Sequence, residues 1–173
     1  MIHAKEATLS STFVTIEQIL PALAAAPARI AEVTAGMTPA QLQAAPNPGE
    51  WSTSDVLAHL RACADVWGDC ISAIIAQDRP TLRAVNPRTW IKSTDYPTQD
   101  FRSSLRAFTR QRSRLVAQLT PLALEDWSRR ATVTGAGKAL ERTVLSYAQG
   151  MASHERPHLK QIKRIASLVR VKP

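Results

Sequence analysis

Hydrophobic residues recur along this chain at spacings of three and four, the period that places them on one face of an α-helix. Four long segments show the pattern, at about 12–36, 52–77, 98–119 and 140–169, and breaks rich in Pro and Gly separate them. No long segment alternates hydrophobic and polar residues with the period of two that is typical of strands. The pattern predicts an all-α fold, a four-helix bundle with a long crossover connection, residues 78–97, between helices two and three.

The first two segments differ in how well their helices are specified. Pro21 and Pro27 lie inside the first, so we expect that helix to be kinked or broken. The second begins at Ser52, where an acid three residues later, Asp55, completes the pattern of a capping box. The inward positions of these two helices are predicted to be Phe13, Ile16, Leu20, Leu23, Ile30 and Met37, then Val56, Leu60, Cys63, Trp67, Cys70 and Ile74.

The third and fourth segments carry polar residues on their predicted inward faces. Arg112 is expected either to pair with an acid or to lay its stem along apolar surface, with contact to a substrate anion as the alternative. The inward positions are Phe101, Leu105, Phe108, Leu115 and Leu119 on helix three, then Leu140, Val144, Tyr147, Met151, His154, His158, Ile162 and Ile165 on helix four. Trp90 and Tyr96 suggest that the crossover lies over the bundle, and Trp127 is expected to anchor the connection before helix four.

Length and composition are those of one soluble domain over 1–173, with an ordered core at about 10–170. No apolar run approaches the roughly 20 residues that span a bilayer. The polar N-terminus, with Glu6, does not resemble a secretory signal. The only two cysteines, Cys63 and Cys70, fall on one face of a predicted helix, so a disulfide scaffold is not expected. A cytoplasmic location is the simplest expectation.

The net charge of +8 is unevenly distributed. Residues 1–60 carry two basic and five acidic side chains, a net charge of −3, so the remainder carries +11. The basic residues follow helical spacing: Arg102, Arg106, Arg110 and Arg114 on one helix, and Arg156, Lys160, Lys163 and Arg170 on another. Such stripes are typical of the solvated back of a helix. An anion-binding surface is the alternative, whereas no motif or row of stacking aromatics supports nucleic-acid binding.

Two histidines on helix four occupy positions that the pattern would otherwise give to Leu or Met. His154 and His158 are one turn apart and face the same way, with Cβ atoms expected about 5–6 Å apart. A buried imidazole without a partner costs about 1–3 kcal/mol, so a pair of them calls for a partner. One divalent ion at about 2.0–2.1 Å from each ring nitrogen would satisfy both.

His59, on helix two, is the third inward histidine. It lies three residues after Val56 and four before Cys63, at the edge of the inward face. Apart from His3 the chain has no other histidine. Metal sites built from facing helices are an established use of bundles, so we predict that His59, His154 and His158 bind one metal ion. Cys63 is the alternative fourth ligand, although its ordinary role would be that of a small core residue.

The segment His154-Glu155-Arg156-Pro157-His158 also matches the metalloprotease pattern H-E-x-x-H. That chemistry needs a third ligand downstream, and residues 159–173 contain no His, Asp or Glu. Pro157 inside the motif removes a helix hydrogen bond and predicts a local kink. A metalloprotease is therefore not favoured.

The chain also resembles the DinB-like superfamily of four-helix metal-binding proteins. The resemblance is carried by Gly49-Glu50-Trp51-Ser52 leading into Val56-Leu57-Ala58-His59-Leu60, and by His154-Glu155-Arg156-Pro157-His158-Leu159-Lys160-Gln161-Ile162. The segments 24–42 and 125–127 are also similar, so it spans about 20–168. It implies a bundle whose nickel or zinc ion is held by one histidine of the second helix and two of the last, which here are His59, His154 and His158. Members with known activity include thiol-dependent transferases and a mycothiol-dependent maleylpyruvate isomerase.

These observations favour a metal-dependent enzyme, a transferase or hydrolase that uses a metal-activated thiol or water on a small substrate. Three protein ligands leave coordination positions open, as in catalytic sites. A low-molecular-weight thiol is the cofactor that the resemblance implies. Glu155, Tyr147 and Arg112 are the candidate catalytic residues, with Glu155 pointing off the inward face and better suited to support a ligand or to pair with an arginine at the surface. One alternative is a non-catalytic metal-binding or structural bundle, in which a homodimer would bury part of the apolar surface. Another is a stress protein that binds anions through the basic stripes.

Overall fold

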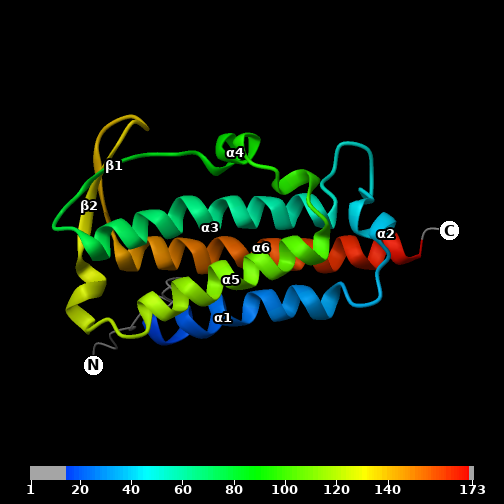
Figure 1. Cartoon of the computed structure of the whole chain (residues 1–173), viewed down its shortest axis with the longest axis horizontal. Helices are drawn as coiled ribbons and strands as arrows, with labels where there is room; N and C mark the ends of the chain where they lie inside the picture. The colour runs from blue at the N-terminus through cyan, green and yellow to red at the C-terminus, as the bar shows by residue number, and fades with distance from the viewer. Residues whose placement is uncertain (1–14, 172–173) are drawn as a thin grey trace, which may run out of the picture.

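Four long amphipathic helices build the molecule: α1 (Ile16–Val33), α3 (Thr53–Ala76), α5 (Phe101–Leu119) and α6 (Val144–Arg170). They form a four-helix bundle in the computed structural model, which describes residues 15–171 (Figure 1). The bundle that the hydrophobic periodicity predicts is thereby confirmed. Phe13 lies outside the described residues. Leu140, predicted to face inward on the last helix, instead precedes that helix and is 39% exposed.

The order of the helices in space explains the crossover. Each long helix packs mainly against two others. The main pairs in contact are α1–α5, α5–α3, α3–α6 and α6–α1. In Figure 1, α3 and α5 run in one direction while α1 and α6 run in the other. Because α3 has 24 residues and is therefore about 36 Å long, the chain must travel back along it before α5 can begin.

Short elements make up the return path between α3 and α5. They are β1 (Thr81–Arg83), α4 (Pro87–Trp90) and two single turns of 3-10 helix, η1 (Ile91–Ser93) and η2 (Tyr96–Thr98), and the last three pack on α3. The Tyr96 hydroxyl donates to a carboxylate oxygen of Asp65 at 2.6 Å, and Arg61 lies over its ring at 3.7 Å. The connection therefore does cover the bundle, as expected, although Trp90 remains 40% exposed.

A small three-stranded sheet at one end of the bundle is a feature that the periodicity did not predict. Its strands, in the order β1-β2-β3, pair β1 in parallel with β2 (Arg130–Thr134) and β2 antiparallel with β3 (Leu140–Thr143). Gly135 and Gly137 form the turn between β2 and β3 with φ of +87° and +91°, a conformation that residues with a Cβ rarely adopt. Strands of three to five residues are too short to show an alternating pattern.

The helix ends follow ordinary capping chemistry, and the internal prolines do not break the helices. Ser52 Oγ accepts from the Asp55 amide at 3.1 Å while the Asp55 carboxylate accepts from the Ser52 amide at 2.9 Å, which is the predicted capping box. Of the two outcomes expected for the first helix, kinked or broken, a break does not occur, since α1 is one helix through Pro21 and Pro27. Likewise α6 continues through Pro157.

Two groups of buried side chains fill the bundle, one toward each end. Ile30, Leu57, Phe108 and Ile165 belong to the group near α2 (Pro39–Gln43). The other group contains Leu23, Ile74, Leu119, Met151 and the predicted anchor Trp127, which lies in the short helix η3 (Leu124–Ser128) and is 3% exposed. The inward positions predicted from the sequence supply most of both groups, because burial of apolar area is what the periodic pattern encodes.

The basic stripes lie on the outer surface of α5 and α6. All of their side chains are exposed except Arg102, which is half-buried and donates to the Thr34 carbonyl at 2.9 Å. At the end of α6, Arg170 donates to the carbonyls of Val33 and Ala35 at 2.9 and 2.7 Å. Part of the positive charge therefore caps the end of α1, where helix carbonyls lack partners. Among the described residues no helix has the length and hydropathy needed to cross a membrane.

Candidate metal centre

The three inward histidines meet where the beginning of α3 packs against the middle of α6. His59 lies in the second turn of α3, and His154 and His158 are one turn apart on α6. Because α3 and α6 are antiparallel neighbours, the start of one helix lies beside the later part of the other. Residues 95 positions apart in sequence are thus brought into contact. His59 is 6% exposed, and both histidines of α6 are half-buried.

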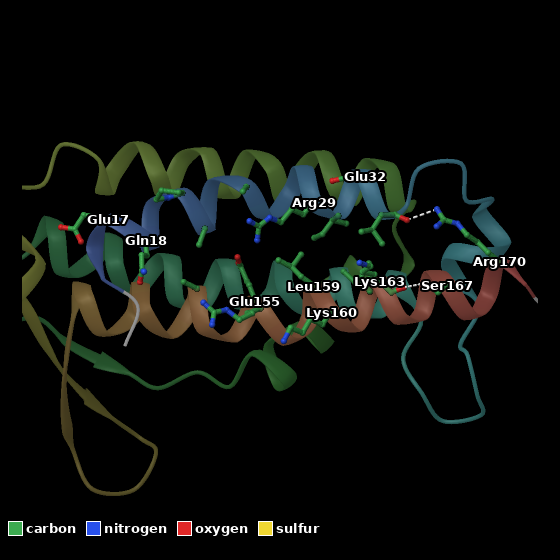
Figure 2. Close-up of a pocket in the computed structure, with 18 residues that line it drawn as sticks. Glu17, Gln18, Arg29, Glu32, Glu155, Leu159, Lys160, Lys163, Ser167 and Arg170 are labelled. Atoms are coloured by element: carbon green, nitrogen blue, oxygen red, sulfur yellow. Dashed lines mark hydrogen bonds between the residues drawn. The ribbon is translucent and has the colours of Figure 1, made fainter. Parts of the chain in front are cut away.

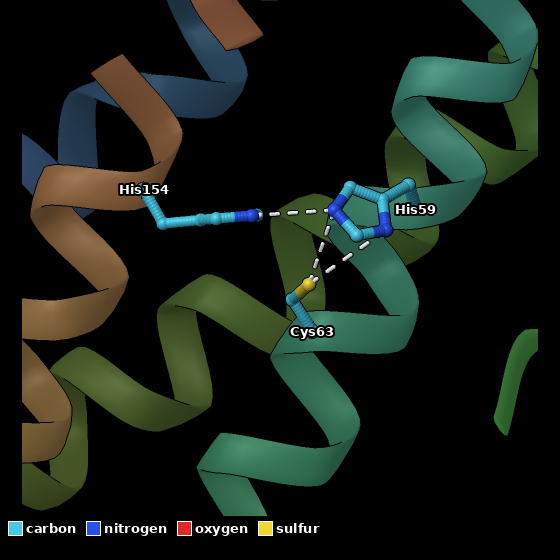
Figure 3. Close-up of side chains that lie close together, drawn as sticks. All are labelled: His59, Cys63 and His154. Atoms are coloured by element: carbon cyan, nitrogen blue, oxygen red, sulfur yellow. Dashed lines mark hydrogen bonds between the residues drawn. The ribbon is translucent and has the colours of Figure 1, made fainter. Parts of the chain in front are cut away.

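The ring nitrogens of the histidines point toward one another. The Nε2 atom of His154 lies 3.3 Å from Nε2 of His59 and 3.3 Å from Nε2 of His158. The ring centroids of His59 and His158 are 5.0 Å apart. Cys63, one turn after His59, joins the cluster, with its Sγ 3.6 Å from His59 Nε2 (Figure 3).

Hydrogen bonds alone do not account for this arrangement. A neutral imidazole nitrogen carries either one proton or one in-plane lone pair. His154 Nε2 can therefore share a hydrogen bond with only one of its two Nε2 neighbours. In addition, Nδ1 of His158 lies 2.9 Å from Gln161 Oε1, an acceptor, so this nitrogen carries the proton and Nε2 of a neutral His158 presents a lone pair to the cluster. At least one of the two Nε2 contacts of His154 is therefore not a hydrogen bond.

The donor atoms fit a divalent metal ion. Two nitrogens bound at about 2.0–2.1 Å to one tetrahedral ion lie about 3.3–3.4 Å apart, close to the separation of the paired Nε2 atoms. Neutral imidazoles are suited to zinc and nickel, among other ions. The donor atoms that all lie within 4.8 Å of one another belong to His59, Cys63 and His154, whereas His158 joins the cluster through its contact with His154. The Gln161 contact is the kind of outer hydrogen bond that orients a ligating histidine.

Two tryptophans pack against the histidine cluster. The ring of Trp51, just before the α3 cap, lies parallel to that of His158, with centroids 6.2 Å apart, and 5.2 Å from that of His59. Trp67 meets His154 edge-to-face at 5.0 Å. Nδ1 of His154 is buried and has no hydrogen-bond partner among the described residues, so aromatic contacts hold this ring in place. Trp51 was part of the family-like motif, and Gln161 lies three residues after His158, a helical neighbour that spacing alone would suggest.

Burial, together with the charges of His158 and Arg88, lowers the pKa of His59 and of His154 from 6.5 to about 4, which keeps these two rings neutral near pH 7. A neutral imidazole is the form that binds metal. Burial also raises the pKa of the Cys63 thiol to about 12, although the positive charges of Arg112 and Arg88 oppose that shift.

These pKa values predict how the stability of the metal-free protein depends on pH. The unfolded chain binds protons on His59 and His154 near pH 6.5, whereas the folded chain does so only near pH 4. Between these values the unfolded state holds more protons, so the free energy of unfolding should fall as the pH is lowered through this window. Urea unfolding of metal-free protein across the window measures the slope. A His59→Gln/His154→Gln variant should show a shallower slope, and equal slopes would contradict the assignment.

Arg112 and Glu155 form a buried ion pair beside the cluster. The two side chains are 2% and 3% exposed, and Nη2 of Arg112 donates to Oε1 of Glu155. Arg112 also lies 4.7 Å above the Phe108 ring, while its Nε and Nη1 atoms are buried and have no hydrogen-bond partner within residues 15–171. Desolvation lowers the pKa of Arg112 to about 10. The sequence suggested a paired arginine here, but the expectation that Glu155 pairs at the surface was wrong, because α6 is enclosed on more than one side.

The third candidate catalytic residue, Tyr147, lies apart from the histidines. It precedes His154 by seven residues, which corresponds to about 10 Å along the helix. Its hydroxyl is hydrogen-bonded to Cys70, and burial raises its pKa. Tyr147 packs against the core group around Trp127, so its contacts tie α6 to α3.

Two pockets open beside the cluster, and two side chains, those of Trp51 and Arg88, line both. The first, of 640 Å³, is formed with Trp51 and His59, and the second, of 530 Å³, with Trp51 and His158. Arg88 of α4 lines each of them. Its side chain is exposed, and nothing in the sequence pattern of the crossover pointed to it. Arg88 therefore places a positive charge at both pockets, together with the carboxylate of Glu50 in one and of Asp55 in the other.

A larger pocket, of 1050 Å³, is a different feature. It runs between α1 and α6, and its lining includes no histidine among the described residues. Figure 2 shows Arg29 of α1 and Glu155 of α6 on its two sides, with Lys160 and Lys163 further along α6. The size of this groove reflects the short side chains of α1 that face it, Ala22 and Ala25 among them.

Comparisons with known proteins identify a family that matches most of this chain. The model of the DinB superfamily matches residues 22–162. Among solved structures, the chain is similar to YfiT from Bacillus subtilis, with a TM-score of 0.75 and 19% sequence identity over 96% of this chain and 92% of that chain. YfiT is described as a probable metal-dependent hydrolase with an unusual four-helix bundle topology. At this identity the likeness establishes the fold. A search of curated proteins found no match.

Proposed function

The chain belongs to the DinB superfamily, and from this premise we propose that it is a metal-dependent hydrolase in which His59, His154 and His158 bind one divalent ion. The observation that carries the proposal is the position of His154 Nε2, 3.3 Å from an Nε2 atom on either side. The description of YfiT as a probable metal-dependent hydrolase supports the same reaction class. Zinc and nickel are the ions that an all-imidazole site suits.

Each neighbouring residue has a distinct role in this proposal. A bound ion supplies Lewis acidity, which lowers the pKa of a water molecule or thiol held against it. Gln161 fixes the proton of His158 on Nδ1, and Trp51 excludes water from one side of the histidines. Glu155 and Arg112 are occupied by each other, so we assign them to positioning His154 rather than to contact with substrate. Tyr147 supports the packing of α6.

Arg88 defines the substrate class that the site favours. An arginine beside both pockets would bind a carboxylate or phosphate group of a small substrate. Its guanidinium is close enough to the histidines to lower the pKa of His59 and of His154. A substrate held by Arg88 would thus place its reacting bond next to the three imidazoles. We therefore propose a small anionic ester or amide as substrate.

Hydrolysis of paired probes tests the proposal. Purified protein should cleave para-nitrophenyl hemisuccinate faster than para-nitrophenyl acetate, and cleavage should stop on chelation and return with one equivalent of zinc or nickel. Removing an arginine–carboxylate contact costs about 1.5–3 kcal/mol, so Arg88→Gln should lower kcat/KM for the anionic ester about 10- to 100-fold with little change for the neutral one. Arg79→Gln, on the same connection, is the matched control.

Two outcomes would count against a hydrolase. Equal turnover by the metal-free protein would separate the activity from the metal. The second outcome is product that forms only when a low-molecular-weight thiol is added, with transfer of the acyl group of the ester to the thiol and release of para-nitrophenol. That result would identify the transferase that the sequence analysis left open.

A further inference from the structure

Cys63 lies closer to the histidine cluster than a core residue needs to. It follows His59 by one turn of α3 and is 2% exposed. Its Sγ atom is 3.6 Å from Nε2 and 4.0 Å from Nδ1 of His59, and it belongs with His154 to the group of donor atoms that lie within 4.8 Å of one another. Figure 3 shows the sulfur on the side of the His59 ring that faces His154.

The separation of sulfur and nitrogen matches shared coordination. A sulfur bound at about 2.3 Å and a nitrogen bound at about 2.0–2.1 Å to one tetrahedral ion lie about 3.5–3.6 Å apart. The observed distance from Cys63 Sγ to His59 Nε2 is 3.6 Å. Thiolate and imidazole together form a donor set that is typical of tetrahedral zinc.

The second cysteine of α3 shows what a purely structural thiol looks like in this helix. Cys70 lies two turns further along the same face, is half-buried, and is hydrogen-bonded to Tyr147. It belongs to no group of metal-ligating side chains among the described residues. The two thiols share a helix and a face, so the difference between them is their distance from the histidines.

We infer that Cys63 is a fourth ligand, so that the metal held by His59, His154 and His158 has three nitrogen donors and one sulfur donor. This inference rests on the proposed metal site and deepens it. On binding, the thiol proton passes to solvent and a bond forms between sulfur and the ion. A sulfur donor favours zinc over nickel. Because four protein ligands fill a tetrahedral set, the water for the proposed hydrolysis would bind as a fifth ligand, an expansion that catalytic zinc sites sometimes show.

Cobalt substitution tests the inference independently of activity. Protein loaded with one equivalent of Co²⁺ should show an intense near-ultraviolet thiolate-to-cobalt charge-transfer band together with visible bands of tetrahedral cobalt. Cys63→Ser should lose the charge-transfer band while keeping the visible bands, and the matched control Cys70→Ser should keep both. Cys63→Val, which retains an apolar side chain of similar size, gives a second test should the serine variant fold poorly.

X-ray absorption on the zinc-loaded wild-type protein needs no variant, and should show a sulfur neighbour at about 2.3 Å beside nitrogens at about 2.0–2.1 Å. Cobalt bound with visible bands but without the charge-transfer band, or a band that survives in Cys63→Ser, would overturn the inference and leave the histidine site intact. Failure of the wild-type protein to bind cobalt at all would overturn the proposed metal site as well, so the two failures are distinguishable.

Discussion

His154→Ala is expected to lower the affinity for zinc or nickel by more than about 100-fold, since loss of an outer hydrogen-bond partner alone typically costs 10- to 100-fold. The reason is geometric. His154 Nε2 is the atom that lies 3.3 Å from both other Nε2 atoms, so its removal takes away the nitrogen that both His59 and His158 approach. Elemental analysis of purified protein and titration against a competing chelator measure the loss.

His3→Ala is the matched control for this experiment. It removes the remaining histidine, which lies outside the described residues, and should leave the metal content unchanged. His154 is half-buried, so the alanine variant should still fold, which circular dichroism can verify. A His154→Ala variant that keeps wild-type metal affinity would show that the converging imidazoles do not form the site.

Arg112→Met is expected to destabilise the protein by about 3–5 kcal/mol, the usual cost of removing one partner of a buried ion pair. The Glu155 carboxylate, 3% exposed, would be left without its cation and with little access to water. For a domain of this length each kcal/mol shifts Tm by about 2–4 °C, so Tm should fall by about 6–20 °C. Thermal and urea unfolding of the metal-free protein measure the effect. Arg110→Met, an exposed arginine two residues earlier on α5, should change stability by less than about 0.5 kcal/mol.

The double variant Arg112→Met/Glu155→Leu measures how much the intact ion pair contributes to the free energy of unfolding. The single variants measure instead the destabilisation caused by leaving one buried charge unpaired. Replacement of both partners by apolar side chains of similar volume is often neutral or stabilising. We therefore expect the double variant to recover most of the stability that either single variant loses, with a large coupling energy in the cycle. Additive losses would mean that Arg112 and Glu155 act independently.

The same double variant tests the positioning role proposed for the pair. Glu155 is the residue next to His154, and its anchoring to α5 restrains the turn of α6 that carries the histidines. A stable double variant with weaker metal binding would support that role. A stable double variant with unchanged metal binding would reduce the pair to a structural feature of the core.

Much of the fold was predictable because burial of apolar surface is written into local spacing. The repeats of three and four predicted four helices, the capping pattern at Ser52 marked the start of α3, and the inward positions of α3 and α5 fill the core as expected. The sheet was not predictable, because its strands are three to five residues long and are stabilised by partners far away in sequence. Leu140 was misassigned for the same reason, since the helical spacing happens to continue into β3.

The candidate site, like the fold, could be predicted from the sequence only in part. The helical period placed His154 and His158 one turn apart and turned His59 inward, because side-chain direction follows from local backbone geometry. It could not tell that the Nε2 atoms would lie 3.3 Å apart, that Cys63 would lie 3.6 Å from His59, or that Arg88 would line both pockets. Those distances depend on how α3, α6 and the crossover pack. Spacing along one helix determines which face of that helix is buried. Contacts between residues about 95 positions apart form only when the helices pack together, because close packing of the core permits one arrangement of the helices.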